Sequence, residues 1–412
     1  MSKEKRRVPK LRFPGFTEDW EQRKLSEVVT INPKTELPDE FKYVDLESVV
    51  GTNLLGFQVI KKENAPSRAQ RLASYGDVFY QTVRPYQRNN YLFENVDKDM
   101  VFSTGYAQLR SKLDSYFLLT LVQNDNFVKV VLDNCTGTSY PAINGSELGK
   151  ITVYIPSNEV EANQIGKVFR GIDKSITLHQ RKLEHLNLKK KALLQKLFPK
   201  NGERYPELRF PGFTDAWEQC KLGDNNTFFT DGNYGNDYPT ANEMSDSVNG
   251  IPFLRGSNLD NGTINLVDVN YITKQKHNLL TSGHTKFDDI IIAVRGSLGN
   301  CGYVAKQFID ININSQLAII RTDKNELSGL FLIEYLLSSL GKKEINRNIT
   351  GTALKQLPIN SLKMINIKYP SIYEQEKISI LLSKLNASIT LHQRKLDHLQ
   401  LQKKALLQQM FV

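Results

Sequence analysis

The chain has 412 residues, of which 40% are hydrophobic and 24% are charged, and this length and composition predict a globular protein of two to three domains. It has no run of about 18 apolar residues and its first ten residues are polar, which argues against a transmembrane helix and a signal peptide and favours the cytoplasm. Three widely spaced cysteines without a CxxC pair argue against a disulfide framework and a structural zinc site, and the net charge of +10 favours nucleic acid as a partner.

The chain begins with a basic arm and a segment that recurs later. Residues 10–25 read KLRFPGFTEDWEQRKL, and residues 207–222 read ELRFPGFTDAWEQCKL. The only two tryptophans, Trp20 and Trp217, occupy equivalent places in this repeat, which we call the anchor. An internal repeat of this kind indicates a duplicated framework, although two long copies are too few for a solenoid.

Residues 25–158 are expected to form a first mixed α/β domain. The segment GDVFYQTVRPY at 76–86 has the pattern of a buried strand followed by an arginine-bearing turn, and Val101 to Leu109 is expected to be a further strand. Side chains suited to contact bases or phosphates follow the first strand and recur in the closing loop TGTSYPA at 136–142. Taken singly, each is explained as well by an ordinary surface role. The candidate DNA-binding residues are Arg84, Tyr86, Gln87, Arg88, Asn90, Thr138 and Tyr140.

Residues 159–200 are expected to form a long helix with a narrow apolar seam. The apolar positions alternate in steps of three and four with no internal proline, which is the pattern of a coiled coil. About 40 residues at a rise of about 1.5 Å give a helix of roughly 60 Å. So narrow a stripe needs a partner helix to bury it. The predicted seam consists of Phe169, Ile172, Ile176, His179, Leu183, Leu186, Leu193 and Leu197.

Residues 201–373 repeat this organisation around a different middle. The segment FDDIIIAVRGSLGN at 287–300 again predicts a buried strand with an arginine-bearing turn, and IPFLRGSNL at 251–259 predicts another. The closing loop TGTALKQ at 350–356 offers small donors and a lysine for phosphate contact. Further predicted elements are a strand at Ile313 to Ile320 and a helix at 332–340. The candidate DNA-binding residues here are Arg255, Asn258, Arg295, Ser297, Asn300 and Lys355.

Residues 374–412 are expected to form a second helix that copies the first. The nine residues SITLHQRKL occur at both 175–183 and 388–396, and KKALLQ also recurs. His179 and His392 fall on the seam, where a polar residue often fixes register or partner choice. The seam of the second helix has the same phase as the first and consists of Leu382, Leu385, Ile389, His392, Leu396, Leu399, Leu406 and Met410.

The basic surplus is concentrated in the two predicted helices and the N-terminal arm. Residues 159–200 carry 10 basic and 4 acidic residues and residues 374–412 carry 6 and 3, whereas 25–158 and 201–373 are slightly acidic. No GxxxxGK[ST], GxGxxG, HExxH or GxSxG motif is present. No carboxylate or cysteine cluster accompanies the six histidines, so a metal site among them is the less favoured interpretation. The absence of an active-site motif favours a binding protein over an enzyme.

This organisation resembles the specificity subunits of type I restriction–modification enzymes over essentially the whole chain. The resemblance rests on the two RFPGF…W anchors, the two TGT loops, the helix entries EANQI and EQEKI, and the twin SITLHQRKL…KKALLQ segments. It implies an α+β fold with two pseudo-symmetric mixed α/β target-recognition domains separated by two long antiparallel coiled-coil helices. The implied domains are the N-terminal arm and anchor (1–24), target-recognition domain 1 (25–158), a central spacer helix (159–200), an anchor with target-recognition domain 2 (201–373) and a C-terminal spacer helix (374–412).

The resemblance also implies a function and partners. Each recognition domain would read one half of a split site in double-stranded DNA, and the helices would dock two modification (methyltransferase) subunits, joined by endonuclease/translocase subunits in the full complex. The chain itself would be non-catalytic and bind no cofactor, because S-adenosylmethionine, ATP and Mg²⁺ would belong to the partner subunits. With the helices antiparallel, His179 and His392 are expected to approach within about one helical turn, or ~5 Å along the axis.

Two other classes of protein remain open on the residues alone. One is a coiled-coil scaffold whose middles bind proteins, which would show no sequence-specific retention of DNA. The other is a stand-alone DNA enzyme, which would need a methyl-donor or metal site for which the sequence shows no motif.

Overall fold

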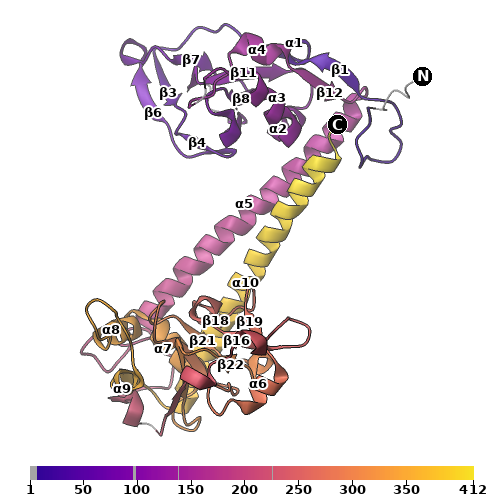
Figure 1. Ribbon diagram of the computed structural model, residues 1–412. Coiled ribbons are helices and arrows are strands. Elements are labelled where there is room, and N and C mark those ends of the chain that lie inside the picture. Colours follow the sequence, from indigo (N-terminus) through magenta and orange to yellow (C-terminus); the bar gives the residue numbers. More distant parts are fainter. Residues whose placement is uncertain (1–6, 96–98, 138, 225) are drawn as a thin grey trace. The chain divides into compact units, whose positions relative to one another are not determined.

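The chain folds into two compact units. The computed structural model describes residues 7–95, 99–137, 139–224 and 226–412 (Figure 1). Unit 1 comprises residues 1–181 and 392–412, and unit 2 comprises residues 182–391. The boundaries fall inside two helices of 38 residues each, α5 (Glu159–Lys196) and α10 (Ile372–Gln409), so each unit contains a segment of both. Within the described ranges, no helix combines the length and the apolar character needed to cross a membrane.

Unit 1 contains two four-stranded sheets. The first, in the order β2–β11–β8–β9, is antiparallel, and the second, in the order β6–β3–β10–β7, has β3 and β10 parallel. All four residues of β8 are buried, as the apolar run in the sequence predicts. The strands are β2 (Val29–Ile31), β3 (Glu40–Val44), β6 (Gln58–Lys61), β7 (Ala69–Leu72), β8 (Val78–Gln81), β9 (Tyr91–Leu92), β10 (Met100–Ser103) and β11 (Tyr106–Ser111), with the hairpin β4 (Val49–Val50) and β5 (Asn53–Leu54).

Unit 2 has the same strand order in its first sheet and differs from unit 1 in the edge strands of its second sheet. The order β14–β23–β20–β21 matches the first sheet of unit 1, and β16 and β22 are parallel like β3 and β10. The outer strand β15 beside β19 has no equivalent among the strands of the second sheet of unit 1, and the place that β7 takes beside β10 corresponds to the isolated antiparallel bridge of His284 with Asn312. The strands are β14 (Phe228–Asp231), β15 (Met244–Ser245), β16 (Ile251–Leu254), β19 (Asn270–Ile272), β20 (Ile290–Ala293), β21 (Cys301–Tyr303), β22 (Asn312–Ile313) and β23 (Leu317–Arg321), with the hairpin β17 (Leu259–Asp260) and β18 (Thr263–Ile264). The matching sheets confirm the predicted α+β class and the pseudo-symmetry.

Two predicted strands are each two strands in the structure. The segment from Val101 to Leu109 is β10 and β11, separated by a turn at residues 104–105. The segment from Ile313 to Ile320 is β22 and β23, because the Asn314 side chain accepts a hydrogen bond from the Gln316 amide at 3.0 Å and fixes a turn between them.

The helix predicted at 332–340 is likewise divided. Ser338 ends α7 and caps α8, since its hydroxyl accepts a hydrogen bond from the Gly341 amide at 3.2 Å. Asn124 divides α2 from α3 in the same way, accepting from the Phe127 amide at 2.8 Å. The shorter helices are α1 (Leu25–Val28), α2 (Ser115–Gln123), α3 (Asp125–Asp133) and α4 (Gly145–Lys150) in unit 1, and α6 (Lys274–Leu279), α7 (Gly329–Leu337), α8 (Ser339–Arg347) and α9 (Ile359–Lys363) in unit 2.

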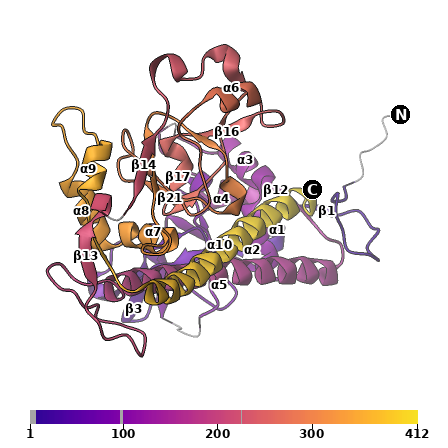
Figure 2. The ribbon, with the colours of Figure 1, turned by 90° about the horizontal axis from the view of Figure 1, so that it is seen from below.

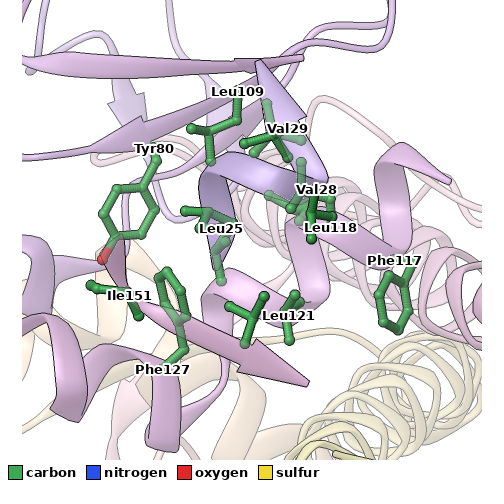
Figure 3. Packing of buried hydrophobic residues seen from close by; sticks show 14 of the residues in the cluster. Leu25, Val28, Val29, Tyr80, Leu109, Phe117, Leu118, Leu121, Phe127 and Ile151 are labelled. Carbon is green, nitrogen blue, oxygen red and sulfur yellow. The ribbon is translucent and has the colours of Figure 1, made fainter. Parts of the chain in front are cut away.

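The two anchor repeats form equivalent parts of the two cores. The strand after each tryptophan pairs with the strand that precedes a long helix: β1 (Glu21–Lys24) with β12 (Thr152–Ile155), and β13 (Glu218–Lys221) with β24 (Asn366–Tyr369). Trp20 packs edge-on against Phe411, with ring centroids 6.0 Å apart, and Trp217 packs edge-on against Phe198 at 5.9 Å. The core beside Trp20 is closed by apolar side chains of α1, α2, α3 and the first sheet (Figure 3).

Within unit 1, α5 and α10 run antiparallel. Asp173 forms an ion pair with Lys403 at 2.6 Å, and the Nδ1 atoms of His179 and His392 lie 2.8 Å apart. Residue numbers therefore rise along α5 in the direction in which they fall along α10. The two segments lie side by side in Figure 1, and Figure 2 shows the two helices crossing when seen from below. The predicted approach of the two histidines is confirmed.

The seam positions differ in burial from the outer positions of the same helices. Every residue assigned to the seam from the sequence is buried or half-buried. The leucines at outer positions are exposed by 67% at Leu178, 61% at Leu188, 52% at Leu391 and 67% at Leu401. Leu391 and Leu401 occupy in α10 the places that Leu178 and Leu188 occupy in α5, so the duplication has preserved two exposed apolar positions on each helix.

A buried carboxyl group where α7 meets α10 predicts a pH effect on unit 2. Glu334 Oε1 accepts a hydrogen bond from Asn386 at 2.8 Å, while Oε2 is buried without a partner among the described residues. Burial raises the pKa of Glu334. The stability that this group contributes is therefore present at low pH and is lost as the pH rises through about 4.3, the ordinary pKa of glutamate, toward the raised value.

We expect Glu334→Gln to stabilise unit 2 at neutral pH and to have little effect below the ordinary glutamate pKa. The glutamine keeps an oxygen for Asn386 and removes the buried charge. Urea unfolding at several pH values checks this, with Glu376→Gln as the exposed control on α10. A variant that is less stable than the parent at neutral pH would contradict it.

Candidate nucleic-acid interface

The arginine turn of unit 1 begins with a residue in the left-handed conformation. Arg84 has φ 53° and ψ 56° and precedes the short 3₁₀ helix η2 (Pro85–Gln87). Its amide donates a hydrogen bond to the Pro141 carbonyl at 2.8 Å, and its guanidinium lies over the Tyr140 ring, 4.4 Å from the centroid. The structure thus brings the arginine turn and the closing loop into one surface.

The other residues predicted for this surface divide into exposed and internally bound groups. Tyr86 is 51% exposed and Gln87 is exposed, although the Gln87 side chain accepts a hydrogen bond from Gln81. Arg88 forms an ion pair with Asp125 at 2.6 Å, and this partner lowers the pKa of Asp125. Asp125 therefore neutralises part of the positive charge that the sequence predicts for this turn.

The prediction that Asn90 contacts DNA is corrected by the structure, because its side chain is buried. It is 1% exposed, and its Oδ1 accepts a hydrogen bond from the Gln81 amide at 2.8 Å. The side chain holds the turn after β8 and has no surface with which to contact DNA. Thr138, also predicted for this surface, lies outside the described residues.

A groove of about 1530 Å³ in unit 1 adjoins this surface, between the arginine turn and the helix pair. Gln87 and Arg88 line one side and residues of α5 and α10 the other. Its charges are of both signs, since Asp125 and Asp173 stand among its lysines and arginines. A polyanion would therefore meet local cationic groups here, and phosphate attraction would be limited.

Unit 2 builds an equivalent surface with a different aromatic residue. Arg295 lies two residues after the end of β20 and is exposed, and its guanidinium lies 5.1 Å from the centroid of the Tyr234 ring. The Leu357 amide donates to the Val294 carbonyl at 3.0 Å, which fixes the closing loop beside the arginine turn. Lys355 is exposed on that loop. Both units thus place an arginine on a tyrosine ring beside a closing loop.

The second predicted cluster of unit 2 is largely structural. Asn258 is 2% exposed, and its side chain accepts a hydrogen bond from the Arg255 amide at 3.0 Å and donates one to the Asn265 carbonyl at 3.1 Å. The prediction that Asn258 contacts DNA is therefore corrected, because its side chain is buried and bound to the backbone. Arg255 donates to the Asp268 carbonyl at 2.6 Å. Ser297 and Asn300 remain exposed in the turn after β20.

Tyr234 is the part of this surface that the sequence analysis missed. The equivalent tyrosine of unit 1 is in the closing loop, whereas Tyr234 follows β14, far earlier in the chain. A search for the same residue at the same place in both repeats could not find it. Stacking on either ring occupies a face of the guanidinium and not its N–H edge; Arg295 Nη1 also donates to the Ser315 carbonyl at 3.4 Å, and its other N–H groups can donate to a base or a phosphate.

Known proteins share both the sequence pattern and the fold. The family model described as the type I restriction modification DNA specificity domain matches residues 17–188 and 216–401. The putative type I restriction enzyme MjaX specificity subunit of Methanocaldococcus jannaschii is 23% identical over 95% of this chain and 92% of that protein. The MjaVIII specificity subunit of the same organism is 24% identical over 71% and 68%. The crystal structure of a type I restriction-modification system S subunit from M. genitalium aligns over 98% of this chain and 99% of that chain, with a TM-score of 0.65 and 15% identity.

Proposed function

The chain belongs to the type I restriction modification DNA specificity family, and we propose that its two units each read one half of a bipartite site in double-stranded DNA. The main observation behind this proposal is that both units place an arginine on a tyrosine ring after equivalent strands of the same sheet, with different residues around it. Arg84 on Tyr140 and Arg295 on Tyr234 follow equivalent strands, yet the surrounding side chains differ. A common frame with unlike side chains suits two readers of unlike sequences.

The proposal assigns catalysis to partner subunits. Two modification subunits would supply methyl transfer from S-adenosylmethionine, and endonuclease/translocase subunits would use ATP and Mg²⁺, while this chain would provide specificity in the cytoplasm. The exposed leucines of α5 and α10 support docking on the helices, since Leu178 and Leu391 occupy equivalent places, as do Leu188 and Leu401. Two equivalent sets of apolar contacts suit two copies of one partner.

Methylation mapping tests the proposal. Cells carrying the modification genes are compared with and without the gene for this chain. A methylated motif of two half-sites with an unspecified spacer should occur only when the gene is present. If the purified complex retains no DNA sequence-specifically and no motif depends on the gene, the coiled-coil scaffold becomes the better interpretation.

Replacing the stacked arginines should weaken DNA binding one half-site at a time. Arg84→Ala or Arg295→Ala should cost about 1–3 kcal/mol if the guanidinium makes a good base contact. Binding of the assembled complex to DNA with changes in either half-site measures this, with Arg23→Ala, an exposed residue paired with Glu21, as the control. A base contact relaxes specificity in one half-site, and a phosphate contact weakens all sequences alike. Unchanged affinity and specificity would remove that arginine from the interface.

A further inference from the structure

Three potential metal ligands meet in unit 2, outside the arginine turn. The two carboxylate oxygens of Asp310 face two imidazole rings: Oδ1 lies 3.1 Å from His284 Nδ1, and Oδ2 lies 3.5 Å from His277 Nε2. One ligand atom from each of the three residues lies within 4.8 Å of the others. The amino-acid sequence alone does not indicate this group, because Asp310 is distant in the chain from both histidines and no spacing motif joins it to them.

The backbone holds these side chains together. His284 forms an isolated antiparallel bridge with Asn312, and the Asp310 amide donates to the Thr285 carbonyl at 2.8 Å. His277 is carried by α6, whose last turn precedes this bridged segment. Asp310 itself has φ 58°, in the left-handed region that a residue other than glycine adopts infrequently. The surrounding hydrogen bonds therefore fix an aspartate in an uncommon conformation, with its carboxylate toward both histidines.

In each histidine, the ring nitrogen that points away from Asp310 lies at hydrogen-bond distance from an oxygen atom, which orients the ring. His284 Nε2 lies 2.8 Å from the Leu280 carbonyl, which can only accept, so Nε2 carries a proton and Nδ1 is the nitrogen left for Asp310 or a metal ion. His277 Nδ1 lies 2.5 Å from Asn312 Oδ1, which leaves Nε2 facing Asp310. A proton on the facing nitrogen can hold each ring to the carboxylate, and a divalent cation that displaces this proton would be bound by the two ring nitrogens and the carboxylate together. Imidazoles that bind metals are oriented by an acceptor on the other ring nitrogen in this manner.

We propose that His277, His284 and Asp310 bind one divalent transition-metal ion, with zinc as the preferred ion. Two imidazoles and one carboxylate are ordinary zinc ligands at distances of about 2.0–2.2 Å, and a tetrahedral arrangement at that length separates the ligand atoms by roughly 3.3 Å. The observed separations, 3.1 Å to Oδ1 and 3.5 Å to Oδ2 of Asp310, are close to that value, and each involves a different oxygen of the carboxylate. The Asp310 side chain is 66% exposed, so the ion can enter from solvent and water can fill the fourth position.

An ion at this site would stabilise the segment that carries the tyrosine beneath Arg295. The loop between the two histidines includes Ser282, whose carbonyl accepts from Asn233 Nδ2 at 3.0 Å and whose hydroxyl donates to Asn233 Oδ1 at 3.1 Å. Tyr234 is the next residue. Metal binding would therefore fasten one side of the arginine turn of unit 2, whether or not that turn contacts DNA.

Metal titration of the full chain tests the site. The purified chain is stripped with a chelator and titrated with Co²⁺, whose absorption reports tetrahedral nitrogen and oxygen ligands, and Zn²⁺ is then added to displace it. We expect one equivalent to bind to the parent chain, and His284→Ala or Asp310→Asn to weaken binding by at least about 10–100-fold. His185→Ala and His398→Ala, exposed on the long helices, are the controls and should bind as the parent does.

A thermal measurement separates ligand loss from misfolding. Asp310→Asn keeps a side chain that tolerates the left-handed conformation, so in chelator its melting temperature should match that of the parent. Added Zn²⁺ should raise the melting temperature of the parent and not that of the variant. The proposal is overturned if the parent binds no stoichiometric metal, if both variants bind as tightly as the parent, or if the control variants lose binding equally.

Discussion

Replacing Arg12 with alanine should lower the free energy of unfolding of unit 1 by about 3–5 kcal/mol, because Glu161 would stay buried without its partner. The guanidinium of Arg12 forms a bidentate pair with the Glu161 carboxylate, with Nε donating to Oε1 at 2.7 Å and Nη2 donating to Oε2 at 2.8 Å. The Glu161 side chain is fully buried. This pair joins the anchor to the first turn of α5.

The same pair occurs in unit 2 and gives an internal replicate. Arg209 donates to both oxygens of Glu374 at 2.9 and 2.8 Å, and the Glu374 side chain is 1% exposed. Arg209→Ala should therefore destabilise unit 2 by a similar amount and leave unit 1 unchanged. Urea unfolding followed by tryptophan fluorescence measures both, since each unit carries one tryptophan, Trp20 or Trp217.

Two controls distinguish an orphaned charge from a general effect of losing arginine. Arg23→Ala removes a pair with Glu21 in which both side chains are largely exposed, and it should cost only about 0–1 kcal/mol. The double change Arg12→Met with Glu161→Leu removes both charges and should recover most of the loss, because apolar replacements of a buried pair are often neutral or stabilising. A small effect of Arg12→Ala alone would mean that water reaches Glu161 in solution.

The sequence was sufficient for the frame because the duplication repeats it. The tryptophan anchors, the closing loops and the phase of the two long helices are each present twice, and the close approach of His179 and His392 follows from their symmetry once the helices are antiparallel, as the family resemblance implies. The break at Ser338 was missed because this capping residue lies within the largely apolar run that was predicted as one helix. A capping hydrogen bond divides such a run without changing its hydrophobic pattern.

The candidate site was predicted only in part, for a related reason. Arg84 and Arg295 follow recognisable strands, so their positions could be inferred. Asn90 and Asn258 have the same residue type as a base-reading side chain, but their amides satisfy buried backbone groups, which the sequence cannot show. Tyr234 and the group around Asp310 depend on contacts between segments far apart in the chain.

Exchanging the middle of one half for that of a homologue should change one half of the methylated motif and preserve the other. The exchanged segments are residues 25–135 and 223–349, which lie between the anchors and the closing loops. Each mismatched base pair in a recognised site costs about 1–3 kcal/mol, so a new recognition surface should abolish use of the old half-site. Sequencing of methylated bases in cells carrying each chimaera measures the motif.

The structure predicts that the two exchanges will differ in how strongly the resulting chimaeras bind DNA. The segment 223–349 contains both Arg295 and its stacking partner Tyr234, so that exchange transfers the arginine with its support. The segment 25–135 contains Arg84 but leaves Tyr140 in the host. The first-half chimaera should therefore bind more weakly than one exchanged over 25–144, which includes the closing loop, and both should specify the same new half-site. If both halves of the motif changed together in any chimaera, the two units would not read independently.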